Sequence, residues 1–113
     1  MTETITISAA INGYLDTVRL ARSENTARTY ANALGFFRQV LDVRNISPDE
    51  TAIEAIDEDA LGWTITALKV YAPTTERLYL AALTGFYEYL AAERIADINL
   101  PRLRLLIRQR ARR

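Results

Sequence analysis

Hydrophobic residues recur at helical spacing in four stretches of this chain, residues 8–21, 24–43, 57–70 and 73–94. Recurrence at every third or fourth position is the pattern of an amphipathic helix, and no stretch shows the strict alternation of a half-buried strand. The apolar faces include Ile11, Leu15, Val18, Ala27, Tyr30, Ala31, Leu34, Phe37, Leu41, Leu61, Ile65, Leu68, Leu78, Tyr79, Ala82, Leu83, Phe86, Tyr89 and Leu90. The pattern predicts an all-α protein with four helices around one core.

Residues that favour helix starts stand where these stretches begin. Ser8, Ser23 and Asp57 are predicted N-caps, and Pro73 suits the first turn of the fourth helix. A break is expected at residues 45–48, which contain Asn, Ser and Pro.

Two segments 49 residues apart, residues 26–34 and 75–83, share the skeleton Thr-x-Arg-x-Tyr-x-x-Ala-Leu. Each places a threonine and an arginine in the first turns of a predicted helix. A helix start attracts anions because its first N–H groups are unpaired and the helix dipole is positive there. Two such starts in one domain favour a surface for nucleic acid. For either segment alone, a capping threonine and a solvated arginine are the simpler interpretation.

Polar side chains also follow one side of the second and fourth helices. Asn25, Arg28, Thr29 and Asn32 recur at helical steps, opposite the apolar stripe of the second helix. The polar row of the fourth helix contains Thr74, Arg77, Ala81, Thr84 and Glu88. These rows are the candidate contact surfaces.

The net charge of zero hides a strong segregation of charge. Residues 49–59 hold six of the 14 acidic residues and no basic one, which leaves eight acidic residues against 14 basic ones elsewhere. Residues 102–113 hold six arginines and no acidic residue. Such a dipolar layout suits a protein that binds a polyanion with one face. A basic tail is also compatible with a solubilising end.

The composition excludes several classes of site. The 113 residues form one domain, and the absence of Cys and His removes disulfides, thiolate metal sites and the usual general base. The N-terminus has no basic region followed by an apolar run, and no stretch approaches the ~20 apolar residues of a membrane span. We expect a cytoplasmic protein with no membrane association, no cofactor and no metal.

Residues 57–59, Asp-Glu-Asp, have two interpretations. As an N-cap followed by first-turn acids, they fit a helix start whose dipole favours negative charge. A carboxylate site for Mg²⁺ is the alternative, and it is disfavoured because the side chains point to different sides of the helix.

All four glycines, Gly13, Gly35, Gly62 and Gly85, fall inside predicted helices. Each costs about 1 kcal/mol relative to alanine there, so a compensating gain is expected. Close crossing of helices is the favoured explanation. Approach of the helix backbone to a phosphate is the less favoured one, because Gly35 and Gly85 lie near the apolar stripes.

Three segments of the sequence, taken in order, resemble a known protein module. Residues 23–37 contain Ser-Glu-Asn-Thr-Ala-Arg-Thr-Tyr and then Leu-Gly-Phe-Phe, which resembles the Ser-x-x-Thr-x-x-x-Tyr opening of tyrosine recombinases of the phage integrase family. Residues 73–90 resemble the second half of that module, whose usual form has Thr, Leu-Ser-Ala-Leu-Arg and Phe-Tyr-x-Tyr-Leu. Residues 98–101, Ile-Asn-Leu-Pro, resemble the Asn-Pro close before the interdomain linker. The resemblance covers about residues 8–102.

The resemblance implies a four-helix SAM-like orthogonal bundle that grips one face of double-stranded DNA. Residues 1–101 would form this core-binding domain and residues 102–113 a basic interdomain linker. The family's DNA-facing positions correspond to Asn25, Thr26, Thr29, Thr74 and Thr75. The polar rows add Arg28 and Arg77, and the basic tail, expected to have no fixed geometry, adds Arg102 and Arg104.

Several positions depart from the family pattern. Ala81 and Thr84 stand where Ser and Arg are frequent, and Leu78 stands where a base is common. These changes would weaken phosphate contacts on the fourth helix. The family's catalytic arginines, histidines and tyrosine belong to a second domain, so the chain is expected to be a non-catalytic, truncated part of a recombinase. Alone it would be a monomer, with other recombinase protomers as partners in the full-length protein.

Two other interpretations remain open at this stage. The same helical packing serves protein-interaction domains that have no nucleic-acid role. An enzyme built on the carboxylates of residues 49–59 is the weakest alternative, since the acidic cluster is its sole support.

Overall fold

A computed structural model of the chain describes residues 4–111. Its elements are α1 (Ile7–Ala21), α2 (Glu24–Val43), the 3₁₀ turn η1 (Ile53–Ala55), α3 (Glu58–Ala67), the 3₁₀ turn η2 (Leu68–Val70), α4 (Pro73–Ala92) and α5 (Leu100–Arg110). Within the described residues there is no strand, beyond an isolated bridge between Thr6 and Ala52. The all-α prediction is confirmed, and the four predicted helices correspond to α1, α2, α3 with η2, and α4.

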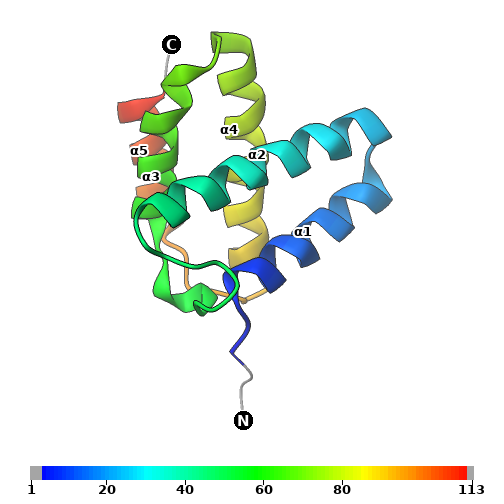
Figure 1. The fold of residues 1–113 in the computed structure, drawn as a ribbon, viewed down its shortest axis with the longest axis vertical. Helices are drawn as coiled ribbons and strands as arrows, with labels where there is room; N and C mark the ends of the chain where they lie inside the picture. The colour runs from blue at the N-terminus through cyan, green and yellow to red at the C-terminus, as the bar shows by residue number, and fades with distance from the viewer. Residues whose placement is uncertain (1–3, 112–113) are drawn as a thin grey trace.

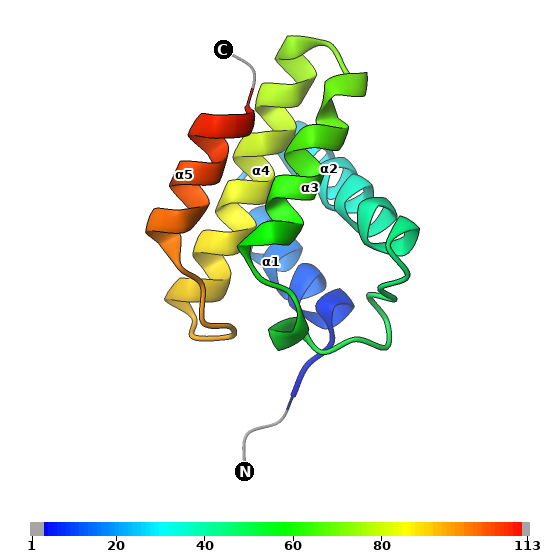
Figure 2. The same cartoon turned by 90° about the vertical axis from the view of Figure 1, so that its left-hand side faces the viewer.

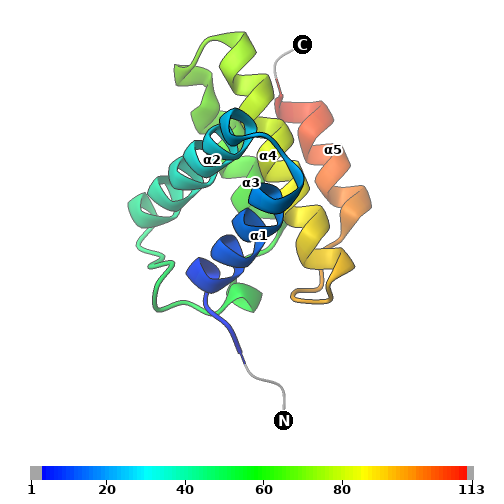
Figure 3. The same ribbon diagram turned by 90° about the vertical axis from the view of Figure 1, so that its right-hand side faces the viewer.

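The helices form two groups that cross at a steep angle. Helices α1 and α2 make an antiparallel hairpin, and this hairpin lies across α4 and α3 (Figure 1). Helices α3, α4 and α5 run side by side (Figure 2), and the hairpin covers one side of this layer (Figure 3). This arrangement is the orthogonal bundle that the family resemblance implied, with one helix more.

The core is centred where α2 crosses α4. Phe37 of α2 packs edge-on against Phe86 and Tyr87 of α4, with ring centroids 6.0 and 6.2 Å apart, and all three side chains are fully buried. Most residues of the predicted apolar stripes join this core, but Leu78 is 51% exposed, so its placement on the apolar face of the fourth helix is wrong. Ile7, Ile53 and Leu103 add buried side chains from outside the predicted stripes. Leu34 and Leu83 are also fully buried.

The predicted helix starts are correct at three positions and wrong at one. The side chains of Ser23 and Asp57 cap α2 and α3, and Pro73 lies in the first turn of α4. Helix α1 is capped by Thr6, whose hydroxyl accepts a hydrogen bond from the Ala9 N–H at 3.1 Å. Ser8, the predicted cap, instead accepts a hydrogen bond from Arg38 at 2.7 Å.

Helix α4 ends at Ala92, two residues before the predicted end. Arg94 has a left-handed backbone with φ 56°, and the Ile95 N–H returns to the Leu90 carbonyl at 2.9 Å. A left-handed residue after the last turn ends a helix because it directs the N–H of the next residue back to a carbonyl of the final turn.

Residues 100–110 form a further helix, α5, beyond the four that the hydrophobic pattern predicts. The expectation that the basic tail has no fixed geometry is wrong over these residues. Leu103 and Leu106 are buried, and α5 packs against α3. The side chain of Asn99 caps the helix by accepting the Arg102 N–H at 3.0 Å. The proposed start of the linker, residue 102, therefore lies inside a packed helix, while Arg112 and Arg113 lie outside the described residues.

Three glycines give room to a side chain of another helix. A Cβ at Gly13 would lie 2.9 Å from the Tyr89 hydroxyl, and one at Gly85 would collide with the Tyr14 hydroxyl. A Cβ at Gly62 would lie 2.8 Å from the guanidinium of Arg110. At these three positions, side chains of other helices pack directly against the glycines, and this packing accounts for the stabilisation that was expected to offset the cost of glycine in a helix.

Two buried tyrosines make the stability sensitive to alkaline pH. Burial raises the pKa of Tyr87, whose hydroxyl donates to the Asp57 carbonyl at 2.8 Å, and that of Tyr14, which donates to the Ala82 carbonyl at 3.0 Å. The folded pKa exceeds the unfolded value of about 10, so the stability from these groups is complete below pH ~10. It is lost as the pH rises further, because the unfolded chain releases protons that the folded chain retains.

Urea unfolding at pH ~8 and pH ~11 checks this expectation, and Tyr87→Phe is the matched variant. The variant should be less stable than the parent at pH ~8, because the buried hydrogen bond from Tyr87 to the Asp57 carbonyl is lost. It should lose less stability between the two pH values. An equal loss in parent and variant would contradict the assignment.

Candidate nucleic-acid interface

The start of α2 presents polar side chains on a capped helix end. The Ser23 hydroxyl accepts the Thr26 N–H at 3.2 Å and donates to the Thr26 hydroxyl at 3.0 Å. The Thr29 hydroxyl donates to the Asn25 carbonyl at 3.0 Å. Asn25 and Arg28 are exposed, whereas Thr26 and Thr29 are partly buried. The Thr29 proton serves the helix itself, and the Thr26 oxygen accepts the Ser23 proton. The amide of Asn25 and the guanidinium of Arg28, which have more N–H donors than a hydroxyl, are therefore the strongest outward donors here.

The start of α4 has no side-chain cap, since Ala72 occupies the N-cap position. Thr74 and Arg77 are exposed and Thr75 is partly buried. Glu76 lies in the same turn but is buried, and its carboxylate accepts a hydrogen bond from the Lys69 ammonium at 2.7 Å. The acidic side chain of this turn therefore points inward beside a cation, and the outward charge is that of Arg77. Combined with the positive end of a 20-residue helix, this turn favours an anion.

The two helix starts lie at separate corners of the molecule. Helix α2 begins at the right of the view in Figure 1, and α4 begins at the top. The space between them is bordered by a hollow of about 320 Å³, lined by Ala31, Asn32, Gly35, Phe36, Gln39, Tyr71 and Tyr79. Asn32 thus connects the polar row of α2 to the first half of α4. On α4, Ala81 and Glu88 line a different hollow, with Arg22 and Tyr30.

Arg102 has a partner within the chain. Its guanidinium donates to Asp59 at 2.5 Å and to Glu58 at 3.4 Å, and the hydrogen bond to Asp59 is the main cause that raises its pKa. Glu58 is buried and also accepts the Asn99 N–H at 3.1 Å. These contacts fasten α5 to α3. Arg104, in contrast, is exposed.

The same contacts explain the acidic residues at positions 57–59. Asp57 accepts the Asp59 N–H at 2.9 Å as a cap, while Glu58 and Asp59 bind Arg102. Among the described residues, no group of three or more acidic side chains is arranged to hold a metal ion. The Mg²⁺ alternative therefore has no support in the geometry.

Two further hollows were not anticipated. The Arg44 guanidinium lies 4.0 Å from the ring centre of Trp63, beside a hollow that Val43 and Arg110 also line. Neither the cation–π pair nor the hollow carries a local sequence signal, because α2, α3 and α5 meet there through the fold.

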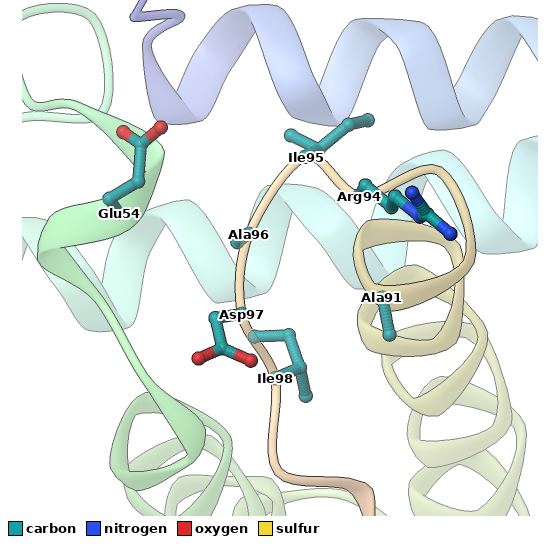
Figure 4. Close-up of a pocket in the computed structure, with 7 residues that line it drawn as sticks. All are labelled: Glu54, Ala91, Arg94, Ile95, Ala96, Asp97 and Ile98. Atoms are coloured by element: carbon teal, nitrogen blue, oxygen red, sulfur yellow. The ribbon is translucent and has the colours of Figure 1, made fainter.

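The other hollow lies at the end of α4, far from its start, and measures about 330 Å³ (Figure 4). Glu54 faces the loop of residues 95–98 across it, and Asp97 lies on that loop. Arg94 also lines this hollow, so two carboxylates stand against one guanidinium and the lining keeps a net negative charge. This disfavours a polyanion, and the candidate interface is therefore the opposite end of α4.

No helix among residues 4–111 is long and apolar enough to cross a membrane. Together, the crossed hairpin, the capped start of α2 and the inward-facing acid of α4 define a small helical module with outward basic and amide groups. Residues 11–94 match the model of the family described as phage integrase, N-terminal SAM-like domain. The match covers most of the chain, and the chain belongs to this family. Neither the curated proteins nor the solved structures gave a match.

Proposed function

We propose that this chain is a DNA-binding module of a site-specific tyrosine recombinase, and that it grips one face of duplex DNA. The family match supports a place in such a protein. The observation that carries the DNA-binding role is the start of α4, where Glu76 is buried against Lys69 while Thr74 and Arg77 face solvent. This turn presents a cation and unpaired backbone donors to an anion. A helix start of this kind binds oxyanions, and phosphate is the oxyanion that duplex DNA presents along its backbone.

The proposed contact residues divide by what their side chains do in the fold. Asn25, Arg28, Thr74 and Arg77 are exposed and would contact DNA directly. The hydroxyls of Thr26, Thr29 and Thr75 would add shorter contacts from the same turns. Arg104 would contact a phosphate from the fixed frame of α5. Arg102 is a weaker candidate than the sequence suggested, because Asp59 and Glu58 hold its guanidinium.

Strand cleavage, in this proposal, belongs to a separate catalytic domain. The matched family is the N-terminal domain, and a chain without histidine cannot supply the family's catalytic histidines. Other recombinase protomers would be its partners on DNA in the cytoplasm. The chain alone would bind one duplex as a monomer.

Titration of a labelled duplex by fluorescence anisotropy at several salt concentrations tests the proposal. We expect a dissociation constant of about 10⁻⁴–10⁻⁶ M near physiological salt, with affinity falling steeply as salt rises. A selection from random duplexes then reports whether a preferred core sequence exists. Absence of duplex binding even at low salt would contradict the proposal, and the protein-interaction interpretation would replace it.

A further inference from the structure

Gly35 differs from the other three glycines of the chain. Gly13, Gly62 and Gly85 each lie under a side chain of another helix. A Cβ at Gly35 would meet no heavy atom within 4 Å among the described residues, apart from its chain neighbours and the adjacent backbone of α2. Gly35 is in the middle of α2, where alanine would be the better helix former. The explanation by helix crossing therefore fails at this position. Nothing inside the fold accounts for the missing side chain.

Gly35 lines an open hollow on the surface of the molecule. It lies in the hollow of about 320 Å³ between α2 and the first half of α4. Phe36, Tyr71 and Tyr79 form one wall, with ring centroids 5.3 Å apart for the first pair and 5.2 Å for the second. The amides of Asn32 and Gln39 stand one turn before and one turn after the glycine, and both residues are exposed. Amide side chains therefore flank an open stretch of the α2 backbone at Gly35.

Gly35 also lies in line with Asn25 and Arg28, the two exposed residues of α2 that are proposed to contact DNA. Asn25, Arg28, Asn32, Gly35 and Gln39 follow each other at steps of three and four residues, which places them along one side of α2. Residues 25–41 contain two arginines and no acidic residue, so this length of the helix is favourable to a polyanion. A side chain at position 35 would project from the middle of the row.

We propose that the sugar–phosphate backbone of one DNA strand seats against the main chain of α2 at Gly35. This inference rests on the proposed function and adds a site that the family resemblance did not assign. The amides of Asn32 and Gln39 donate to phosphate oxygens on either side of the seat, and the aromatic wall packs against deoxyribose. Because phosphate contacts carry no base information, the seat sets how closely the helix approaches any duplex.

Substitutions of increasing size at position 35 test the seat. The probe is a labelled mixed-sequence duplex of about 20 base pairs at about 50 mM salt, where phosphate contacts dominate. Gly35→Ala should weaken binding about threefold and Gly35→Gln about tenfold, which corresponds to loss of charge-assisted hydrogen bonds. Thermal unfolding should show the opposite trend, with the melting temperature of Gly35→Ala raised by about 4 °C. Ala9→Gln, at an exposed position of α1, is the matched control and should bind like the parent.

The outcomes separate this inference from the proposed function. Weaker binding by Gly35→Gln, with a melting temperature at or above that of the parent, supports the seat. If Gly35→Gln binds like the parent while Arg28→Ala binds more weakly, the seat is overturned and the DNA-binding function stands. If the parent binds no duplex, the function fails and the seat fails with it. A melting temperature of Gly35→Ala below that of the parent would show a structural role for the glycine and would also overturn the seat.

Discussion

Replacing Phe37 with alanine is expected to lower the free energy of unfolding by about 3–5 kcal/mol. The side chain is fully buried at the crossing of α2 and α4, where it contacts the rings of Phe86 and Tyr87. Removal of the ring leaves a cavity between two helices of 20 residues each, which cannot close without moving the hairpin. Urea unfolding followed by circular dichroism measures the loss. The comparison requires that the free energy of unfolding depends on urea concentration with the same slope in parent and variant.

Val43→Ala is the control for this substitution. Val43 lies on the same helix but is 84% exposed, so its truncation should change the free energy of unfolding by less than about 0.5 kcal/mol. Phe86→Ala should resemble Phe37→Ala. A loss below about 1 kcal/mol at both phenylalanines would contradict the packing described here.

The helices of the bundle were predictable because their signals are local. Ser23 and Asp57 cap within three residues of the groups they bind, and the apolar period of α2 placed Phe37 in the core. The exposed rows of Asn25, Arg28 and Arg77 followed from the same period. Whether these side chains contact DNA stays a prediction, since exposure alone identifies no partner.

Helix α5 was not predictable in the same way. Its arginines dominate the composition, and the spacing of Leu103 and Leu106 is too short a pattern to outweigh them. What holds Arg102 is a pair of carboxylates more than 40 residues away in the chain, at Glu58 and Asp59. A contact between residues so far apart in the chain produces no periodic pattern in the sequence. The charge of the tail alone therefore does not indicate that it folds as a packed helix.

The glycines likewise depend on tertiary contacts that the sequence does not reveal. The sequence predicted a gain at each, yet only the fold reveals that Tyr14 seats on Gly85 and that nothing seats on Gly35. Which side chain covers a helix surface is decided by the crossing of α1, α2 and α4, not by the residues next to the glycine. Whether a glycine is covered by another side chain, as Gly85 is, or left uncovered, as Gly35 is, can therefore be read only from the tertiary structure.

The arginines allow the proposed interface to be separated from the basic end of the chain. Arg28→Ala and Arg77→Ala should each weaken duplex binding about tenfold at low salt, because each removes a charge-assisted contact to phosphate. Each should also reduce the slope of log affinity against log salt by about 0.9, since one fewer counterion is released. Arg102→Ala should leave that slope unchanged, because Asp59 and Glu58 already neutralise the guanidinium.

Arg19→Ala is the matched control for lost charge. Arg19 is an exposed arginine of α1 that pairs with Asp16 at 2.7 Å, outside the proposed interface, and its removal should alter neither affinity nor slope. Anisotropy titrations of all four variants on one duplex, with unfolding curves to verify that each is folded, provide the comparison. Suppose that Arg102→Ala reduces the slope while Arg28→Ala and Arg77→Ala do not. Phosphate would then be bound by the end formed by α3 and α5, and the starts of α2 and α4 would not be the DNA-binding surface.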